Sequence, residues 1–142
     1  MPLRRRTALL AAPVALAVLA AGCAPQQSSS SDSVKKFTGD QRAAAQTVED
    51  LESAANDSDE TKICTQLLSK ALAGRIAANG HGCGPGVDAA IKDTDSTAMT
   101  VEAVRVTGAT ATARVKFETG KKDRQGSITL TREGGRWRIS GF

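Results

Sequence analysis

Apolar residues recur at spacings of three and four over residues 38–73, the pattern of amphipathic helices. The first stripe predicts a helix whose buried face is formed by Ala44, Val48, Leu51 and Ala55, with Gln41, Glu49, Asp50 and Glu52 off that face. Thr38 and Gln41 have the spacing of a capping box at its start. Polar residues 56–59 end this helix, and a second is predicted over residues 60–73 with its buried side formed by Ile63, Cys64, Leu67, Leu68, Ala71 and Leu72.

A glycine-dense loop over residues 79–86 follows, and a short third helix is predicted over residues 87–92 after Pro85. The loop lacks the lysine of a phosphate-binding loop and the strand-then-helix setting of a dinucleotide fingerprint. It therefore predicts a tight connection around Cys83. His81, the only histidine of the chain, lies in this loop and has no partner in a recognisable motif.

From Met99 onward the period changes to two, which predicts β-strands. A change of parity between Ala103 and Val104 indicates a β-bulge or a strong twist in the first strand. A polar hairpin loop is predicted over residues 120–126 and a two-residue turn at Gly134-Gly135. The inward positions of the last three strands are Ala111, Ala113, Val115, Phe117, Ile128, Leu130, Trp137 and Ile139. Helices followed by a four-stranded antiparallel sheet with one apolar face predict an α+β fold, with the N-terminal helices packed on the sheet.

An apolar run of 14 residues, 8–21, follows three arginines near the start of the chain. A membrane-spanning helix needs about 20 residues, so this run predicts an export signal instead. It ends in Leu19-Ala20-Ala21-Gly22-Cys23, which resembles the lipobox of bacterial lipoproteins. The resemblance implies that residues 1–22 are a signal peptide and that Cys23 carries a lipid anchor at the extracytoplasmic face of the cell membrane. A plain secretory signal, with Cys23 incidental, is the alternative.

Residues 23–36 are polar and serine-rich, which predicts a disordered tether between the anchor and a domain over residues 37–142. Three of the 19 basic residues lie before Cys23, which leaves 16 basic against 15 acidic residues, a net charge of +1. A nearly neutral domain offers no basic face for nucleic acid, so none is expected as a partner.

Cys64 and Cys83 are the only thiols that remain once Cys23 is acylated. An even pair in an exported domain predicts a disulfide. A metal site formed by Cys64, His81 and Cys83 is the alternative, but it lacks a fourth ligand and the usual short cysteine spacing. No metal and no cofactor are therefore expected.

The closing strands resemble the end of NTF2-like domains over residues 109–115, 127–130 and 133–139, where a glycine turn precedes Trp137 between two arginines. The run Ile63-Cys64-Thr65-Gln66-Leu67-Leu68, with a second cysteine before a short helix, is similar to small actinobacterial lipoproteins of that superfamily. The resemblance implies a curved sheet wrapped around a long helix, forming a cone with a pocket. Its expected lining is Val115, Phe117, Leu130, Trp137 and Ile139.

None of the predicted inward strand positions titrates, whereas enzymes of the family place acidic, histidine or tyrosine side chains inside the cone. We therefore expect a domain without catalytic activity, and three hypotheses follow. The first is a binding or interaction module that holds a partner protein or cell-wall component. The second is a carrier of an apolar small molecule or lipid in the cone, and the third is an enzyme. The charged outer sheet face favours a monomer; it includes Arg114, Lys116, Arg136 and Arg138.

Overall fold

The structure of the chain is a computed structural model that describes residues 32–79, 81–93, 98–119 and 122–142. Its helices are α1 (Asp32–Lys35), α2 (Gly39–Asn56), α3 (Glu60–Lys62), the π-helical turn η1 (Ile63–Leu67), α4 (Lys70–Ala78) and α5 (Cys83–Lys92). Its strands are β1 (Ala98–Thr107), β2 (Thr110–Thr119), β3 (Lys122–Glu133) and β4 (Arg136–Gly141). None of the described helices is both long enough and apolar enough to span a bilayer.

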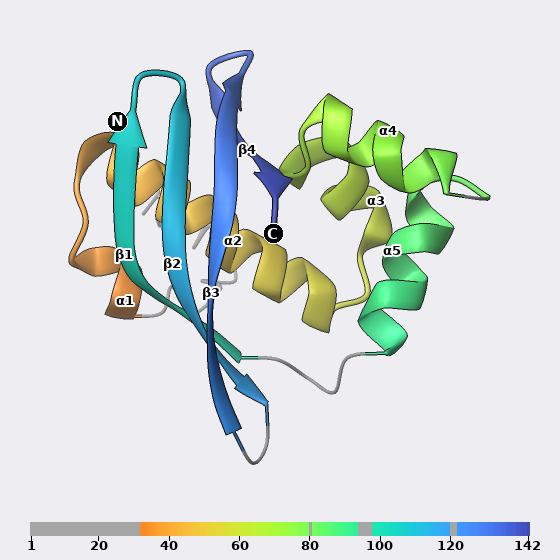
Figure 1. Cartoon of the computed structure of the whole chain (residues 1–142), viewed down its shortest axis with the longest axis horizontal. Helices are drawn as coiled ribbons and strands as arrows, with labels where there is room; N and C mark the ends of the chain where they lie inside the picture. The colour runs from red at the N-terminus through yellow and green to blue at the C-terminus, as the bar shows by residue number, and fades with distance from the viewer. Residues whose placement is uncertain (1–31, 80, 94–97, 120–121) are drawn as a thin grey trace, which may run out of the picture.

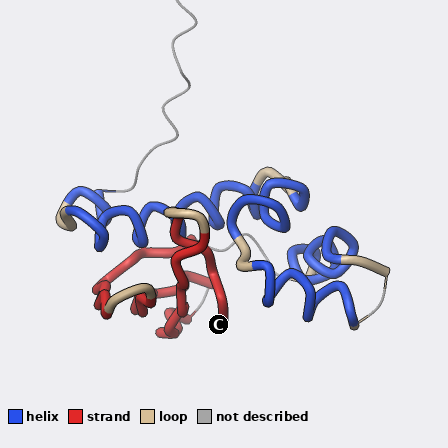
Figure 2. The backbone as a smooth tube through the Cα atoms, turned by 90° about the horizontal axis from the view of Figure 1, so that it is seen from above, coloured by secondary structure: helices blue, strands red, loops and turns tan. Residues whose placement is uncertain are grey.

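The strands form one antiparallel meander in the order β1-β2-β3-β4, and helices cover one face of it. The long helix α2 crosses that face, whereas α3, α4 and α5 gather beyond the β4 edge (Figures 1 and 2). The alternating apolar residues of the strands pack beneath α2, where Val101, Val115, Ile128, Leu130 and Ile139 are fully buried. The α+β prediction is therefore confirmed.

The strand boundaries follow the sequence pattern with one exception. The register of β1 and β2 shifts between Val101 and Ala103, so Glu102 is the extra residue of a bulge, one of the two features that the change of parity indicated. The predicted hairpin loop over residues 120–126 is wrong, because β3 already begins at Lys122. Backbone pairing continues through Glu118 and Asp123, so the polar residues assigned to the loop extend the strand instead.

The predicted second helix over residues 60–73 is wrong as one continuous helix, because the helical backbone is interrupted at Leu68 and Ser69. Leu68 is extended and pairs with Ile139 of β4 in a parallel bridge, and the Ser69 amide donates to the Ile139 carbonyl at 2.8 Å. The Ser69 hydroxyl then caps α4 by accepting from the Leu72 amide at 3.1 Å. Leu68 and Ser69 thus pair with backbone groups at the free edge of β4. A continuous helix would leave those N–H and C=O groups of β4 unpaired. The break also leaves Ala71, predicted to be buried, exposed on α4.

Two predictions for α2 need correction. Thr38 stands at the N-cap, but its side chain makes no cap hydrogen bond, and the Gln41 amide instead donates to the Val104 carbonyl at 3.0 Å. Glu49, predicted to lie off the buried face, is only 8% exposed and accepts a hydrogen bond from Ser33 at 2.8 Å. Both changes occur because α2 is covered by β1 on one side and by α1 on another.

The first described helix lies before the predicted domain boundary. Helix α1 occupies Asp32–Lys35, and Val34 is 4% exposed within the core, so these residues are not part of a disordered tether. One apolar residue among serines and lysines produces no periodicity, which explains why the sequence pattern missed it. The rest of the predicted tether, the signal peptide and Cys23 lie outside the described residues.

Candidate functional site

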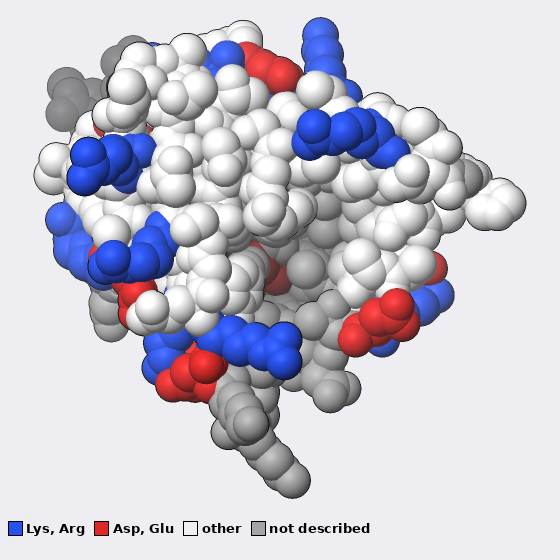
Figure 3. Space-filling model, in the orientation of Figure 1, with Lys and Arg blue, Asp and Glu red and all other residues white. Residues whose placement is uncertain are grey.

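An open cavity of about 530 Å³ lies where the C-terminal half of α2 meets α5 and the ends of β1 and β2. The space-filling view shows it as a hollow between the sheet and the helical group, with acidic atoms at its floor (Figure 3). We call it the α2–α5 groove. Its size falls within the ~300–1,000 Å³ typical of small-molecule pockets. Its lining comprises Leu51, Glu52, Ala55, Asn56, Ser58, Ile63, Leu68, Ile76, Gly86, Val87, Ala90, Ile91, Met99, Phe117 and Phe142.

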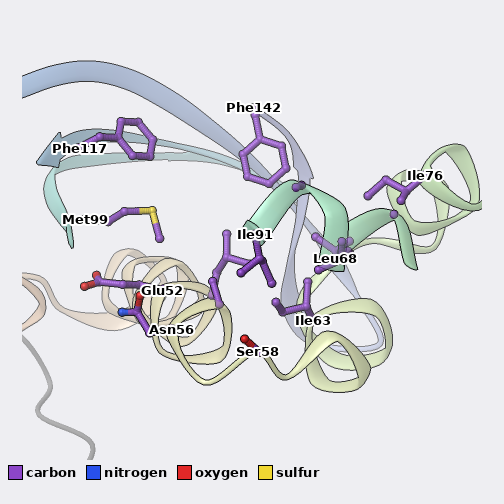
Figure 4. Close-up of a pocket in the computed structure, with 15 residues that line it drawn as sticks. Glu52, Asn56, Ser58, Ile63, Leu68, Ile76, Ile91, Met99, Phe117 and Phe142 are labelled. Carbon is purple, nitrogen blue, oxygen red and sulfur yellow. The ribbon is translucent and has the colours of Figure 1, made fainter. Parts of the chain in front are cut away.

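The groove has two chemically different ends (Figure 4). Glu52 and Asn56, one turn apart on α2, lie at the end near Met99. Ile63, Leu68 and Ile76 form the opposite end, and Ser58 lies away from Glu52, toward Ile63. Phe142 stands at the edge of the groove and is 73% exposed, an unusual state for so large an apolar ring. The site therefore offers a long apolar surface with polar groups at one end.

Of the five residues predicted to line a pocket, Phe117 lies in the groove. Val115, Leu130, Trp137 and Ile139 are instead buried core residues, between 0% and 4% exposed. Their side chains point inward as the alternation predicts, but α2 contacts β1, β2 and β4 and fills the space above them. The cavity is consequently displaced from the centre of the sheet toward α5.

Close approaches of backbone to side chain shape two walls of the groove. A Cβ atom on Gly86 would lie 2.6 Å from Cγ2 of Ile76, so α4 and α5 pack at a distance that only glycine allows. A Cβ atom on Gly126 would lie 2.8 Å from the Phe117 ring, so that glycine leaves room for the ring beside the groove. Both positions need glycine because a side chain would not fit there, and neither has a positive φ angle.

The disulfide between Cys64 and Cys83 is present, with the two Cα atoms 6.1 Å apart. It joins η1 to the first residue of α5 and so fixes the wall that carries Val87 and Ile91. With both sulfurs in this bond, neither is a free thiolate for the alternative metal site. Among the residues that the structure describes, no cluster of side chains suited to a metal ion is present. His81 is exposed in the turn before α5.

Glu52 is the lining residue with a titratable side chain in the described part of the chain. Burial raises the pKa of its carboxyl above the ordinary value of 4.5. A hydrogen bond with the backbone of Met99 lowers the pKa, while the charges of Glu49 and Glu118 raise it further. Glu52 forms no ion pair with any described Lys or Arg. The polar end of the groove is thus an acid without a cationic partner among the residues that the structure describes.

Glu52→Gln is expected to stabilise the domain at pH 7. The raised pKa means that the folded chain holds the proton more tightly than the unfolded chain, so stability falls as the pH rises from 4.5 through the folded pKa. The difference between the variant and the wild type should therefore be largest at neutral pH and vanish below pH 4.5. Urea unfolding at pH 7 and at pH 4 measures it.

Glu102→Gln is the control, because Glu102 lies on β1 outside the groove in an exposed pair with Arg114. Its replacement should change the unfolding free energy by less than about 1 kcal/mol at either pH. A Glu52→Gln variant that is less stable than the wild type at pH 7 would contradict the assigned role of burial.

The sequence pattern missed the polar end of the groove because it assigned Glu52 to the exposed side of α2. A usable signal existed: Glu52 follows Val48 by four residues and precedes Ala55 by three, which are spacings of one helical face. Ile76, Val87 and Ile91 were missed for another reason. Their positions on the groove depend on how α4 and α5 pack against each other and the sheet.

No protein-family model matches the sequence, and no curated protein is similar to it. Among solved structures, a de novo designed NTF2 fold protein, NT-9, superposes with a TM-score of 0.52 at 15% identity, over 73% of this chain and 86% of the design. A variant of the NTF2 design Rd1NTF2_05 has a TM-score of 0.48 at 13% identity, over 72% and 96%. An LEH-like epoxide hydrolase from M. tuberculosis has a TM-score of 0.40 at 14% identity, over 75% and 83%.

The superposition on NT-9 shows that the chain has an NTF2-like fold, as the resemblance of the closing strands implied. At this level of identity the likeness concerns the fold alone. The function has to be argued from the groove.

Proposed function

We propose that this protein is a lipid-anchored extracytoplasmic binding protein whose domain carries an apolar small molecule in the α2–α5 groove. The observation that carries the proposal is the groove itself, an open, mainly apolar cavity with polar side chains at one end. Small-molecule sites have this composition, since apolar walls supply affinity and a few polar groups fix orientation. The exposed Phe142 ring at its edge adds apolar surface that a ligand would cover.

The groove changes the order of the sequence-based hypotheses. A module that binds a partner protein or the cell wall would use an exposed surface, whereas the described structure provides a cavity. Catalysis would require positioned acid, base or nucleophile groups. The polar lining supplies one carboxyl, Glu52, together with the amide of Asn56 and the hydroxyl of Ser58. We therefore favour a carrier without catalytic activity and without cofactor.

Native mass spectrometry tests the carrier function on residues 23–142 with Cys23→Ser, recovered from an oxidising host. Every described residue of the hydrophobic core lies between Val34 and Ile139, so this chain contains all of them. The expected spectrum shows an adduct, acquired from host lipids, that is lost on denaturation. A bare mass, also after incubation with lipids of the native host, would contradict the proposal.

Ala55→Phe provides a matched variant, because Ala55 lines the groove on α2 and a large ring there would fill it. It should lose the adduct. Ala43→Phe is the control on the exposed side of the same helix and should keep the adduct. Equal adduct occupancy in both variants would place the ligand elsewhere.

The anchor is tested separately through Cys23. We expect full-length wild type in the membrane fraction, with a mass at residue 23 that includes acyl chains, because two or more chains give stable anchoring. Cys23→Ser should move most of the protein to the soluble extracytoplasmic fraction. Membrane retention of the variant would contradict anchoring through Cys23, whereas a soluble wild type without acyl chains would favour the alternative of a plain secretory signal.

A further inference from the structure

The ligand's chemical class follows from the charges at the polar end of the groove. Glu52 lies there with an apolar wall formed by Met99 and Phe117 on the facing strands. The carboxylates of Glu49 on α2 and Glu118 on β2 are near enough to act on it electrostatically. Glu118 is paired with Lys116, so the charge that dominates this end of the groove is the carboxylate of Glu52, which gives it a negative potential when ionised.

Lys116 on β2 does not pair with Glu52, since its ammonium group is held by two other carboxylates. Lys116 lies 3.2 Å from the Glu118 carboxylate and 2.8 Å from that of Asp123. Within the described structure Glu52 has no ion pair, and its polar neighbours are the Met99 backbone and the lining amide of Asn56. A carboxylate held in an apolar groove without a counterion is stabilised by any cation that enters.

We infer that the α2–α5 groove binds an amphipathic amine, with its ammonium group on the Glu52 carboxylate and its apolar chain along Ile63, Leu68 and Ile91. This inference rests on the proposed carrier function and specifies its ligand. An anionic amphiphile such as a fatty acid would place a second negative charge against Glu52. A neutral alcohol would gain a hydrogen bond but no charge complementarity. The ammonium form fits best because it also relieves the burial of the Glu52 charge.

The groove matches such a molecule in layout as well as in charge. The apolar end at Ile63, Leu68 and Ile76 is opposite the end that carries Glu52, so a chain lying along the groove brings its head group to the carboxyl (Figure 4). Asn56, one turn further along α2, adds an amide oxygen that can accept a second N–H from the ammonium. The apolar chain would also shield the exposed ring of Phe142.

Three probes of equal chain length separate the possibilities: decylammonium, decanol and decanoate. Each is titrated calorimetrically at pH 7, the two ions below their micellar concentrations and decanol below its solubility limit. Three proteins are compared, all comprising residues 23–142 with Cys23→Ser. The first has no other change and serves as the wild type, the second adds Glu52→Gln, and the third adds Glu102→Gln. We expect decylammonium to bind the wild type about ten-fold more tightly than decanol, and decanoate to bind most weakly. Glu52→Gln should weaken decylammonium about ten-fold and leave decanol within about two-fold, while Glu102→Gln should leave both unchanged.

Equal affinities for the three probes, tightest binding of decanoate, or an unchanged preference in Glu52→Gln would overturn the amine assignment and leave the carrier function standing. No binding of any probe would overturn the carrier function together with the amine assignment. Because Glu52→Gln is expected to fold at least as stably as the wild type at this pH, a lost preference in that variant reports the missing charge. Its thermal transition, recorded with each titration, verifies this.

Discussion

The Cys64→Ser/Cys83→Ser double variant is expected to lose about 3 kcal/mol of unfolding free energy. The bridge closes a sequence separation of 19 residues, so its removal restores conformational entropy to the unfolded chain. Three short helical segments depend on it, because η1, α4 and α5 contribute few buried residues of their own. For a domain of this size the loss corresponds to a decrease in Tm of roughly 10–20 °C.

Calorimetry on three samples tests this expectation: the oxidised wild type, the wild type with reductant, and the double variant. The last two should coincide, because both lack the same covalent link. A double variant that melts within about 3 °C of the oxidised protein would show that the helical group is held by noncovalent packing. Ligand binding should fall in parallel, since the bridge positions the α5 wall that carries Val87 and Ile91.

Gly86→Ala is expected to lower the unfolding free energy by about 1–3 kcal/mol, the usual range for overpacking. The new methyl group would lie 2.6 Å from Cγ2 of Ile76, an atom that only a change of χ1 could move, and helices hold Ile strongly to one χ1 rotamer. Relief requires α4 and α5 to move apart. Because Gly86 and Ile76 both line the groove, the same movement should weaken ligand binding.

Gly74→Ala is the matched control, because Gly74 lies on the exposed side of α4, the other helix of this contact, and a Cβ atom there would meet nothing within 4 Å. Alanine is favoured over glycine in helices by up to about 1 kcal/mol, so this variant should be neutral or more stable. Urea unfolding of both variants measures the contrast. Equal effects at the two positions would argue against a tight α4–α5 contact.

The strand half of the domain follows from local pattern. Three local patterns predicted features that the structure contains. Alternation over Val115 and Phe117 predicted β2, the glycines at residues 134–135 predicted the last turn, and the parity change around Ala103 predicted the irregularity in β1. Each depends on neighbours close in sequence, since adjacent strands of a meander pair through short connections. The Cys64–Cys83 pairing was equally accessible, because the domain retains only two cysteines.

The helical half was predicted less well because its shape depends on distant partners. The break at Leu68 arises from pairing with Ile139, which lies 71 positions later in the chain. Burial of Glu49 depends on Ser33 of α1, a helix that the serine-rich composition did not predict. Helical periodicity specifies an apolar face, and it does not specify which element covers that face.

The sequence by itself determined the α+β class, the order of the strands, the disulfide and the apolar inner face of the sheet. The fold class, the strand order and the apolar face depend on the period of apolar side chains along the chain. The disulfide depends on there being only two cysteines in the domain. Only the tertiary structure decided where the cavity lies and which residues line it. A cavity is the space left after packing, so it depends on the joint positions of α2, α4, α5 and the sheet. Residues that read as pocket lining, such as Leu130 and Ile139, became core, and Glu52, which read as surface, became the polar end of the groove.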